Sequence, residues 1–267
     1  MFTELLQAER FGCRICRQMS HHADIHFHIL PGVDDGPSSI DESVALAAAA
    51  VADGTRTVVA TPHVRDGFLT DVSELPDRVR ELEERLAREG IGLAVRRGAE
   101  LGHEMVGRLS QAELDSVAHG PPGGRWLLVE TPFVASGDEF TAATDELRDR
   151  GFAVVVAHPE RARDSFGASA LRHELASGSV LQVNAWSLVG RHGPEAFEKA
   201  HAMLRGGQVG VVGSDAHGGR RQPALTLALA ACGQAGMAPH DAQRLVAATP
   251  HRMLERGLHA PAPALVA

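Results

Sequence analysis

The sequence lacks several side chains on which common catalytic mechanisms depend. Its 267 residues contain no tyrosine and a single lysine, Lys199. A tyrosine nucleophile is therefore excluded, and a Schiff-base or P-loop lysine is disfavoured because Lys199 lies in a helical segment. None of the three cysteines is followed by the arginine-containing loop of a cysteine phosphatase. If the protein acts on phosphate esters, it must therefore use metal ions.

Cysteines and long apolar runs are scarce as well. Cys13, Cys16 and Cys232 cannot form a disulfide framework, which fits a reducing compartment. Cys13 and Cys16, with two histidines nearby, provide half of a zinc site at most. No apolar run approaches the roughly 20 residues that cross a bilayer, and residues 1–20 have no signal-like core. We therefore expect a cytoplasmic protein without membrane insertion, and the net charge of −8 disfavours nucleic acid as a partner.

The segment from Asp24 to Gly36 brings imidazole and carboxylate groups together. It begins with Asp-Ile-His-Phe-His and ends with Asp-Asp-Gly. In an extended strand residues i and i+2 point to the same side, so His26 and His28 face one cavity. Such ligands suit Zn, Mn or Fe. A structural role explains this pair alone equally well, so the interpretation depends on the rest of the chain.

The rest of the chain repeats one pattern, in which an apolar strand ends in a polar residue and is followed by an amphipathic helix. Six further predicted strands cover residues 57–62, 93–99, 126–129, 153–157, 180–183 and 209–214, and they end at His63, Glu100, Glu130, His158, Asn184, and Asp215 with His217. Such alternation indicates parallel strands with helical crossovers, and polar groups at the carboxyl ends mark the active face of a barrel. The sequence therefore predicts an α/β fold built as a seven-stranded, TIM-like (β/α) barrel.

The predicted helices fix the order of the elements. They cover residues 41–52, 76–89, 138–150, 168–177, 194–205, 222–236 and one or two helices within 241–256. Ser39 and Glu42 form a capping box for the first helix, and Gly54 and Gly90 end the first two in left-handed conformations. No linker divides the chain, so residues 21–267 are predicted to form one domain after a flexible extension at residues 1–20.

Six ordered motifs resemble the polymerase-and-histidinol-phosphatase (PHP) superfamily. They lie at residues 24–37, 60–63, 98–100, 157–161, 182–184 and 214–217. The run from Leu30 to Pro37 and the His158-Pro-Glu-Arg161 segment are most similar to the manganese-dependent protein-tyrosine phosphatases of capsular and exopolysaccharide loci, the CpsB/YwqE type. The resemblance covers about residues 22–256. Because family members begin just before the first motif, Met19 is an alternative start.

The resemblance implies a distorted seven-stranded barrel with a three-metal cluster, of Mn with Fe or Zn as alternatives, at its carboxyl-end face. The first metal would be surrounded by His26, His28, Glu100 and Asp215, the second by Glu100, His63 and His158, and the third by Asp35 and His217. Asp34 is an alternative to Asp35. Glu130 and Asn184 are expected behind the ligands, where they would orient histidines.

The resemblance also implies how phosphate would be bound and attacked. A metal-bridged hydroxide would be the nucleophile, because closely spaced divalent ions lower the pKa of water. Arg161 would hold the phosphoryl oxygens bidentately. Arg220 or Arg221 would provide a second clamp, and the spacing does not decide between them. His217 or a metal-bound water would protonate the leaving group.

Three functional interpretations remain open. The first is a phosphatase of phosphotyrosine in a partner protein, by resemblance a bacterial tyrosine kinase that controls capsular or exopolysaccharide synthesis. The second is a PHP phosphatase of a small metabolite such as histidinol phosphate, which would need a tighter, closed pocket. The third is a non-catalytic, partner-binding barrel, which the complete ligand set disfavours. A PHP exonuclease is disfavoured by the negative charge. The short loop at residues 64–73 favours the first interpretation, and the sequence leaves homo-oligomerisation open.

Overall fold

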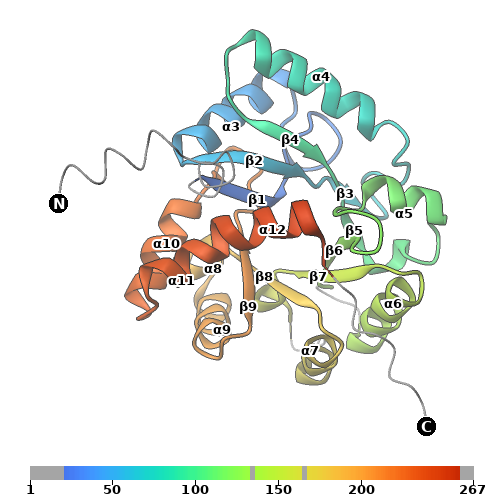
Figure 1. Cartoon of the computed structure of the whole chain (residues 1–267), viewed down its shortest axis with the longest axis vertical. Helices are drawn as coiled ribbons and strands as arrows, with labels where there is room; N and C mark the ends of the chain where they lie inside the picture. Colours follow the sequence, from blue (N-terminus) through green and yellow to red (C-terminus); the bar gives the residue numbers. More distant parts are fainter. Residues whose placement is uncertain (1–20, 133–135, 164–166, 259–267) are drawn as a thin grey trace.

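The strands form two parallel sheets that follow one another around a barrel (Figure 1). The computed structural model describes residues 21–132, 136–163 and 167–258. One sheet has the order β1-β2-β4, with β1 His22–Phe27, β2 Thr55–Ala60 and β4 Ala94–Arg97. The other has the order β3-β5-β6-β7-β8-β9, with β3 His63–Val64, β5 Glu100–Gly102, β6 Trp126–Glu130, β7 Ala153–Ala157, β8 Val180–Asn184 and β9 Val209–Gly213. The predicted α/β barrel is confirmed.

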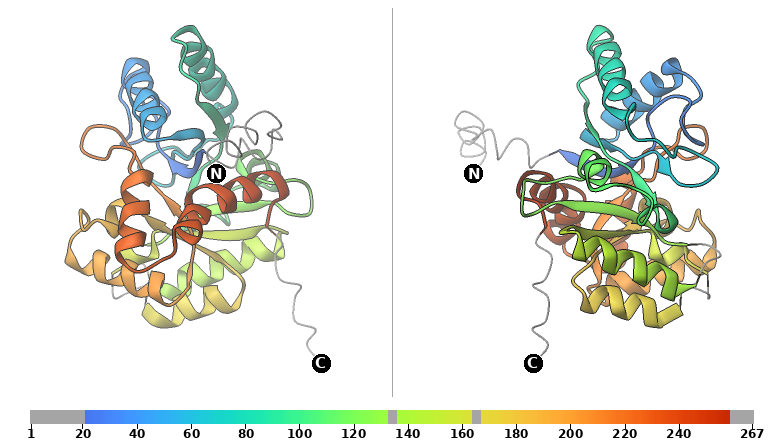
Figure 2. Two further views of the ribbon diagram at one scale, coloured as in Figure 1. Left: turned by 60° about the vertical axis from the view of Figure 1, so that its left-hand side comes forward. Right: turned by 90° about the vertical axis from the view of Figure 1, so that its right-hand side faces the viewer.

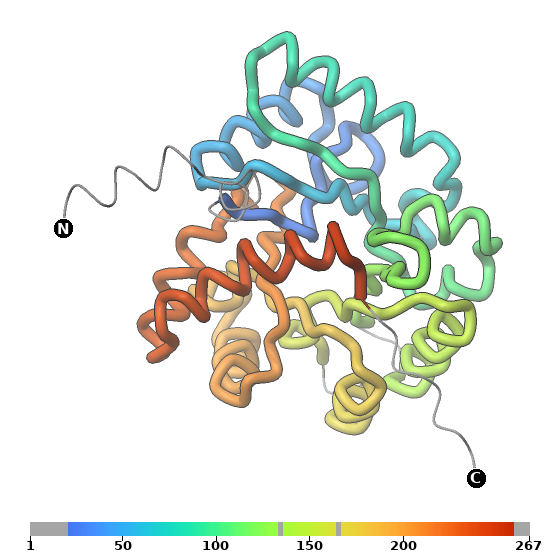
Figure 3. The backbone as a smooth tube through the Cα atoms, viewed as in Figure 1, coloured from blue at the N-terminus to red at the C-terminus, as the bar shows by residue number. Residues whose placement is uncertain are grey.

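The barrel closes between its first strand and the segment that follows its last one. A β-bridge joins Phe27 at the end of β1 to Ala216, which follows β9. The backbone tube in Figure 3 accordingly runs once around the barrel, from β1 in blue to β9 in orange. This closure brings the first and last predicted motifs side by side.

Two of the seven predicted strands end early, and each is followed by a second, short strand beyond its predicted end. The segment predicted at residues 57–62 ends as β2 at Ala60, and β3 begins at His63, after Thr61 and Pro62. The segment predicted at residues 93–99 ends as β4 at Arg97, and β5 begins at Glu100, after Gly98 and Ala99. Pro62 has no N–H group for a strand ladder. The breaks separate the two sheets and give the barrel its distorted form.

Helices surround the barrel. They are α3 Ile40–Ala52, α4 Leu75–Arg88, α5 Gln111–Val117, α6 Gly137–Asp149, α7 Gly167–Ala176, α8 Ala185–Leu188, α9 Pro194–Arg205, α10 Leu225–Gln234, α11 Pro239–Gln243 and α12 Thr249–Arg256. The short α5 and α8 were not predicted. At the start of α3, Ser39 caps the Glu42 N–H group as expected, but the Glu42 carboxylate binds Ser38 instead of closing a capping box. Among the described residues no helix is long and apolar enough to cross a bilayer.

The amino-terminal end of the barrel is closed by α12. Apolar side chains from strands all around the barrel, including Val59, Trp126 and Val155, form one buried cluster with Met253 of α12. The Trp126 indole N–H also donates a hydrogen bond to the Met253 carbonyl, 3.0 Å away. Figure 2 shows α12 on one side of the molecule and the loops that follow the strands on the other. Functional groups therefore gather at the carboxyl ends of the strands.

Candidate metal centre

The eight predicted metal ligands converge at the carboxyl-terminal ends of the strands. They are His26 in β1, His28 and Asp35 after β1, His63 in β3, Glu100 in β5, His158 after β7, and Asp215 and His217 after β9. Most of these side chains are buried, and only the Asp35 side chain is exposed to a large extent, at 46%. The barrel therefore holds a cluster of imidazoles and carboxylates that has one open side at Asp35.

The carboxylate of Glu100 lies at the centre of this cluster. Its Oε2 atom is 3.2 Å from His26 Nε2, 3.2 Å from His28 Nε2 and 3.0 Å from His63 Nδ1. Its Oε1 atom is 2.9 Å from His158 Nε2. Asp215 contacts two of the same histidines, with Oδ1 3.4 Å from His26 Nε2 and 3.5 Å from His28 Nε2.

The donor set fits divalent metal ions. Glu100 Oε2 and His63 Nδ1 are buried and form no hydrogen bond of good geometry with the described residues. Buried polar atoms of this kind are costly unless a partner satisfies them. The candidate ligands fall into four overlapping groups, and within each group one ligand atom per residue lies within 4.8 Å of the others. The groups are His28, Asp35, His63 and His217; His26, Glu100 and His158; His26, His28 and Asp215; and His63, Glu100 and Glu130. Imidazole and carboxylate ligands without thiolate suit Mn, Fe or Zn.

These groups overlap only in part with the division among three metals that the family resemblance implied. His63 and His158 fall in different groups and contact different oxygens of Glu100, and His28 and His63 join Asp35 and His217. Glu130, which was expected behind the ligands, belongs to a group itself and lies 4.0 Å from His63 Nδ1. Between the two neighbouring aspartates, Asp35 faces the cluster, with Oδ1 3.1 Å from His217 Nε2.

A second layer of side chains orients these groups. His28 Nδ1 lies 2.7 Å from Asp34 Oδ2, and His26 Nδ1 lies 2.8 Å from Gln182 Oε1. Asn184, expected to orient a histidine, instead donates a hydrogen bond of 2.7 Å to Asp215 Oδ2. Such partners fix the ring orientation of metal-binding histidines. Gln182 begins the motif at residues 182–184 but was given no role from the sequence, although its position two residues before Asn184 places both on one face of β8.

The backbone is strained at two of the ligand positions. His158 has φ 37° and Asp215 has φ 52°, and they are the only non-glycine residues with positive φ in the described parts of the chain. Residues held in this region cost free energy and cluster at functional sites. Asp24, the first residue of the leading motif, has a different role, because its buried carboxylate accepts hydrogen bonds from the His26 and Ser214 N–H groups, each 3.1 Å away. It ties β1 to the end of β9.

The charges of the cluster are strongly coupled. Burial alone would lower the pKa of His28, but hydrogen bonds to Asp34 and Glu100 raise it to about 10. Burial opposes ionisation of Glu100, yet the neighbouring His26 and His63 hold the pKa of its carboxyl well below the usual range. Burial and the His28 charge lower the pKa of His217 to about 4, so its imidazole is neutral at pH 7.

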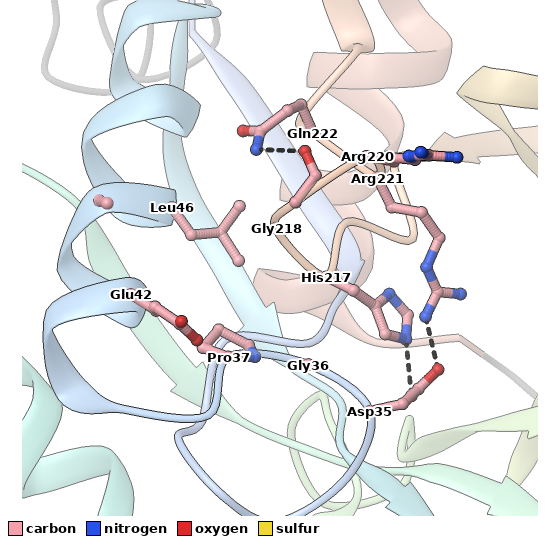
Figure 4. A pocket seen from close by; sticks show the side chains of 12 residues that line it. Asp35, Gly36, Pro37, Glu42, Leu46, His217, Gly218, Arg220, Arg221 and Gln222 are labelled. Atoms are coloured by element: carbon pink, nitrogen blue, oxygen red, sulfur yellow. Dashed lines mark hydrogen bonds and ion pairs between the residues drawn. The ribbon is translucent and has the colours of Figure 1, made fainter.

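Two of the three predicted arginines reach the cluster. An N–H group of Arg161, in the 3₁₀ turn Pro159–Arg161, donates a hydrogen bond of 2.8 Å to Asp215 Oδ2. Arg221 makes a contact of 2.7 Å with Asp35 Oδ2, whereas the exposed Arg220 points away from Asp35 (Figure 4) and has no ion pair with the described residues. Arg65, which the sequence analysis missed, contacts Glu130 and is 3.7 Å from Glu104. Only its position two residues after His63 signalled it.

A cleft of about 630 Å³ borders the cluster on the His217 side (Figure 4). One wall is formed by Asp35 and Pro37 in the loop before α3 and by Leu46 in α3. The other wall is the loop from His217 to Gln222. Exposed residues, among them Arg220 and Gln222, line its mouth. The metal ligands are therefore accessible from a cleft that opens to solvent.

Comparisons with known proteins agree with this architecture. A family model described as "Capsular polysaccharide synthesis, CpsB/CapC" matches residues 22–255. Tyrosine-protein phosphatase YwqE from Bacillus subtilis is 31% identical over 196 residues, covering 73% of this chain and 76% of YwqE. Putative tyrosine-protein phosphatase CapC from Staphylococcus aureus is 29% identical over 208 residues, covering 75% of this chain and 78% of CapC.

Solved structures with a similar fold include a relative from the same group of proteins. A structure from work on YwqE of Bacillus subtilis and CpsB of Streptococcus pneumoniae, described there as unique metal-dependent tyrosine phosphatases, superposes with a TM-score of 0.71 at 29% identity. The superposed region covers 84% of this chain and 93% of the solved chain. An amidohydrolase from Mycoplasma synoviae, with a TM-score of 0.54 and 12% identity, shares the fold alone. The chain belongs to the CpsB/CapC family of capsular polysaccharide synthesis proteins.

Proposed function

We propose that this protein is a metal-dependent phosphatase that hydrolyses phosphotyrosine in a partner protein. The observation that carries the proposal is the convergence of the eight predicted ligand side chains, with Glu100 at their centre and Arg161 and Arg221 at the edge of the cluster. The relatives named tyrosine-protein phosphatases support phosphotyrosine as the substrate. We also propose that the metal is Mn, that the enzyme is cytoplasmic, and that the partner is a tyrosine kinase controlling capsular or exopolysaccharide synthesis.

The candidate ligands and the arginines would have separate functions in the reaction. Divalent ions held by the histidines, Asp35, Glu100 and Asp215 would supply an activated water and neutralise phosphoryl oxygens. The guanidinium groups of Arg161 and Arg221 would turn from their carboxylate partners to the outer phosphoryl oxygens, which they match bidentately. A phenolate has a pKa near 10, so its departure needs little help from an acid. With a pKa lowered to about 4 by burial, His217 fits the ligand role better than the acid role.

No thiol in the described residues competes for the role of nucleophile. Cys232 is buried in α10, and burial raises the pKa of its thiol to about 11. A thiol of this kind is protonated and unreactive at neutral pH. The proposed reaction therefore uses metal-activated water as the nucleophile and does not use this thiol.

A phosphatase of a small metabolite is the second candidate, because it would use the same ligand cluster. Such an enzyme needs a pocket that encloses its substrate. The cleft beside His217 instead opens past exposed residues, which suits a side chain presented by a protein. This openness favours phosphotyrosine over histidinol phosphate.

Parallel assays test the proposal. Purified protein is assayed for metal content and for phosphate release from a phosphotyrosine peptide and from histidinol phosphate, before and after chelation. We expect activity on the peptide that is lost on chelation, restored by Mn and unaffected by thiol alkylation. Preference for histidinol phosphate would favour the second candidate, and full activity in metal-free protein would refute the metal mechanism.

A further inference from the structure

An exposed aromatic ring lies at the edge of the metal centre. Phe68, in the loop between β3 and α4, is 43% exposed, and one face of its ring stacks on His63 with centroids 5.1 Å apart and planes inclined by 24°. Only one other large apolar side chain in the described part of the chain, Leu227 of α10, is exposed to a similar extent. The position of Phe68 therefore calls for an explanation.

Phe68 is not needed to fill the core. Its neighbour Leu69 packs against the main apolar cluster, and Val72 in the same loop is buried. The two side chains anchor the loop from inside. The aromatic ring of Phe68 is thus left on the outer side of the loop, where it contacts a candidate metal ligand.

The loop backbone holds the ring in place. The Arg65 N–H group donates to the Leu69 carbonyl, at 3.0 Å, and the Phe68 N–H group donates to the Arg65 carbonyl, at 3.1 Å. Gly67 completes this turn with φ +90°, a conformation that side chains disfavour. The Arg65 side chain contacts Glu130 of the metal centre. These contacts fix the backbone position from which the Phe68 ring reaches His63.

We propose that Phe68 is a substrate-binding platform that selects aryl over alkyl phosphates. The inference rests on the proposed function and deepens it. An aryl phosphate carries its ring one oxygen away from phosphorus, so a phosphoryl group bound beside His63 has its ring within reach of Phe68, whose ring centroid is 5.1 Å from that of His63. Aromatic rings attract one another in offset or edge-to-face contact. An alkyl phosphate would bind the same ligands without this contact.

The test compares two non-hydrolysable probes, benzylphosphonate and ethylphosphonate, in which a CH2 group replaces the bridging oxygen of an aryl or alkyl phosphate, on Mn-loaded protein. In Phe68→Ala we expect the Kd of benzylphosphonate to rise about tenfold, while the Kd of ethylphosphonate and the metal content stay unchanged. Phe68→Trp should restore tight binding of benzylphosphonate. Leu227→Ala, which removes an exposed apolar side chain far along the sequence in α10, is the matched control and should change neither Kd.

The outcomes separate this inference from the proposed function. Equal weakening of both probes, or loss of metal, in Phe68→Ala would mean that the ring only shields His63. No change in either Kd would also overturn the platform. If the wild-type protein hydrolyses no aryl phosphate, the proposed function fails, but a difference between the probes that depends on Phe68 would still establish the platform.

Discussion

Glu100 shows how strongly the residues of the site depend on one another. Its carboxylate is fully buried, and three imidazole nitrogens surround one of its oxygens at 3.0 to 3.2 Å. A buried carboxylate is costly unless positive charge compensates it. Protonated histidines or bound cations must therefore balance Glu100 and Asp215. Removing one anion from this set changes the affinity of the whole cluster for metal.

Asp215→Ala should accordingly remove bound metal. The carboxylate lies within 3.5 Å of His26 and His28 and is among the candidate ligands. We expect metal content to fall and kcat on a phosphotyrosine peptide to drop by several orders of magnitude, because the activated water is lost. Metal analysis and kinetics on the same preparation measure this. A variant with full metal content and near-normal kcat would show that Asp215 is only structural.

The three arginines should behave differently from one another. We expect Arg161→Ala to keep its metal and to lose about 2 to 4 kcal/mol of transition-state stabilisation in kcat/KM. Arg221→Ala should also lower kcat/KM. Arg220→Ala is the control and should remain near wild type, because Arg220 points away from Asp35 (Figure 4). Near-normal kcat/KM in Arg161→Ala with unchanged metal content would refute its role as a phosphate clamp.

The sequence could predict ligand types but not every contact between them. Polar residues at strand ends are visible in one sequence, and the eight predicted ligands lie together. The sequence alone does not show whether Asp34 or Asp35 faces the cluster, because this depends on the conformation of the loop backbone. The N–H groups of Gly36 and His63 hold the Asp34 carboxylate, at 2.9 and 3.0 Å. Contacts of this kind depend on the tertiary fold.

At the scale of elements, the strand breaks had no clear signal in apolar periodicity. The run at residues 93–99 reads as one strand, but Gly98 lies against the buried side chains of Val59 and His119. Only the three-dimensional approach of β2 and the segment before β6 requires a glycine there. The order of the major helices and strands followed from periodicity, whereas the short α5 and α8 offered too few residues to show a period.

Gly98→Ala should therefore destabilise the barrel at the break between β4 and β5. A Cβ atom at Gly98 would lie 2.4 Å from His119 Nε2 and 2.6 Å from Val59 Cγ1. Overpacking of this kind lowers the free energy of unfolding by about 1 to 3 kcal/mol. Gly92→Ala is the matched control, because a Cβ atom there would meet nothing within 4 Å. Urea unfolding of both variants measures the difference, and equal stabilities would contradict the packing argument.

At the scale of the molecule, the two ends of the barrel differ. The amino-terminal end is packed with apolar side chains and covered by α12, so it requires no ion. The carboxyl-terminal end holds buried charges whose balance changes with metal and with pH. Global stability should therefore respond to conditions mainly through the metal centre.

The effect of Mn on thermal stability should grow with pH. In metal-free protein, despite burial, the hydrogen bonds to Asp34 and Glu100 raise the pKa of His28 to about 10, against about 6.5 for an unperturbed histidine. Its protonated form therefore stabilises the fold fully below about pH 6.5, and this contribution is lost as pH rises towards 10. Metal binding must displace that proton, so affinity for Mn rises with pH.

We thus expect saturating Mn to raise Tm by several degrees at about pH 8.5, and by clearly less at about pH 6. Differential scanning calorimetry with and without Mn at both pH values measures the two increments. Asp215→Ala is the control, in which the Mn effect should nearly vanish at both. An increment in wild-type protein that is equal at both pH values, or larger at the lower one, would mean that the imidazole of His28 does not exchange a proton for metal.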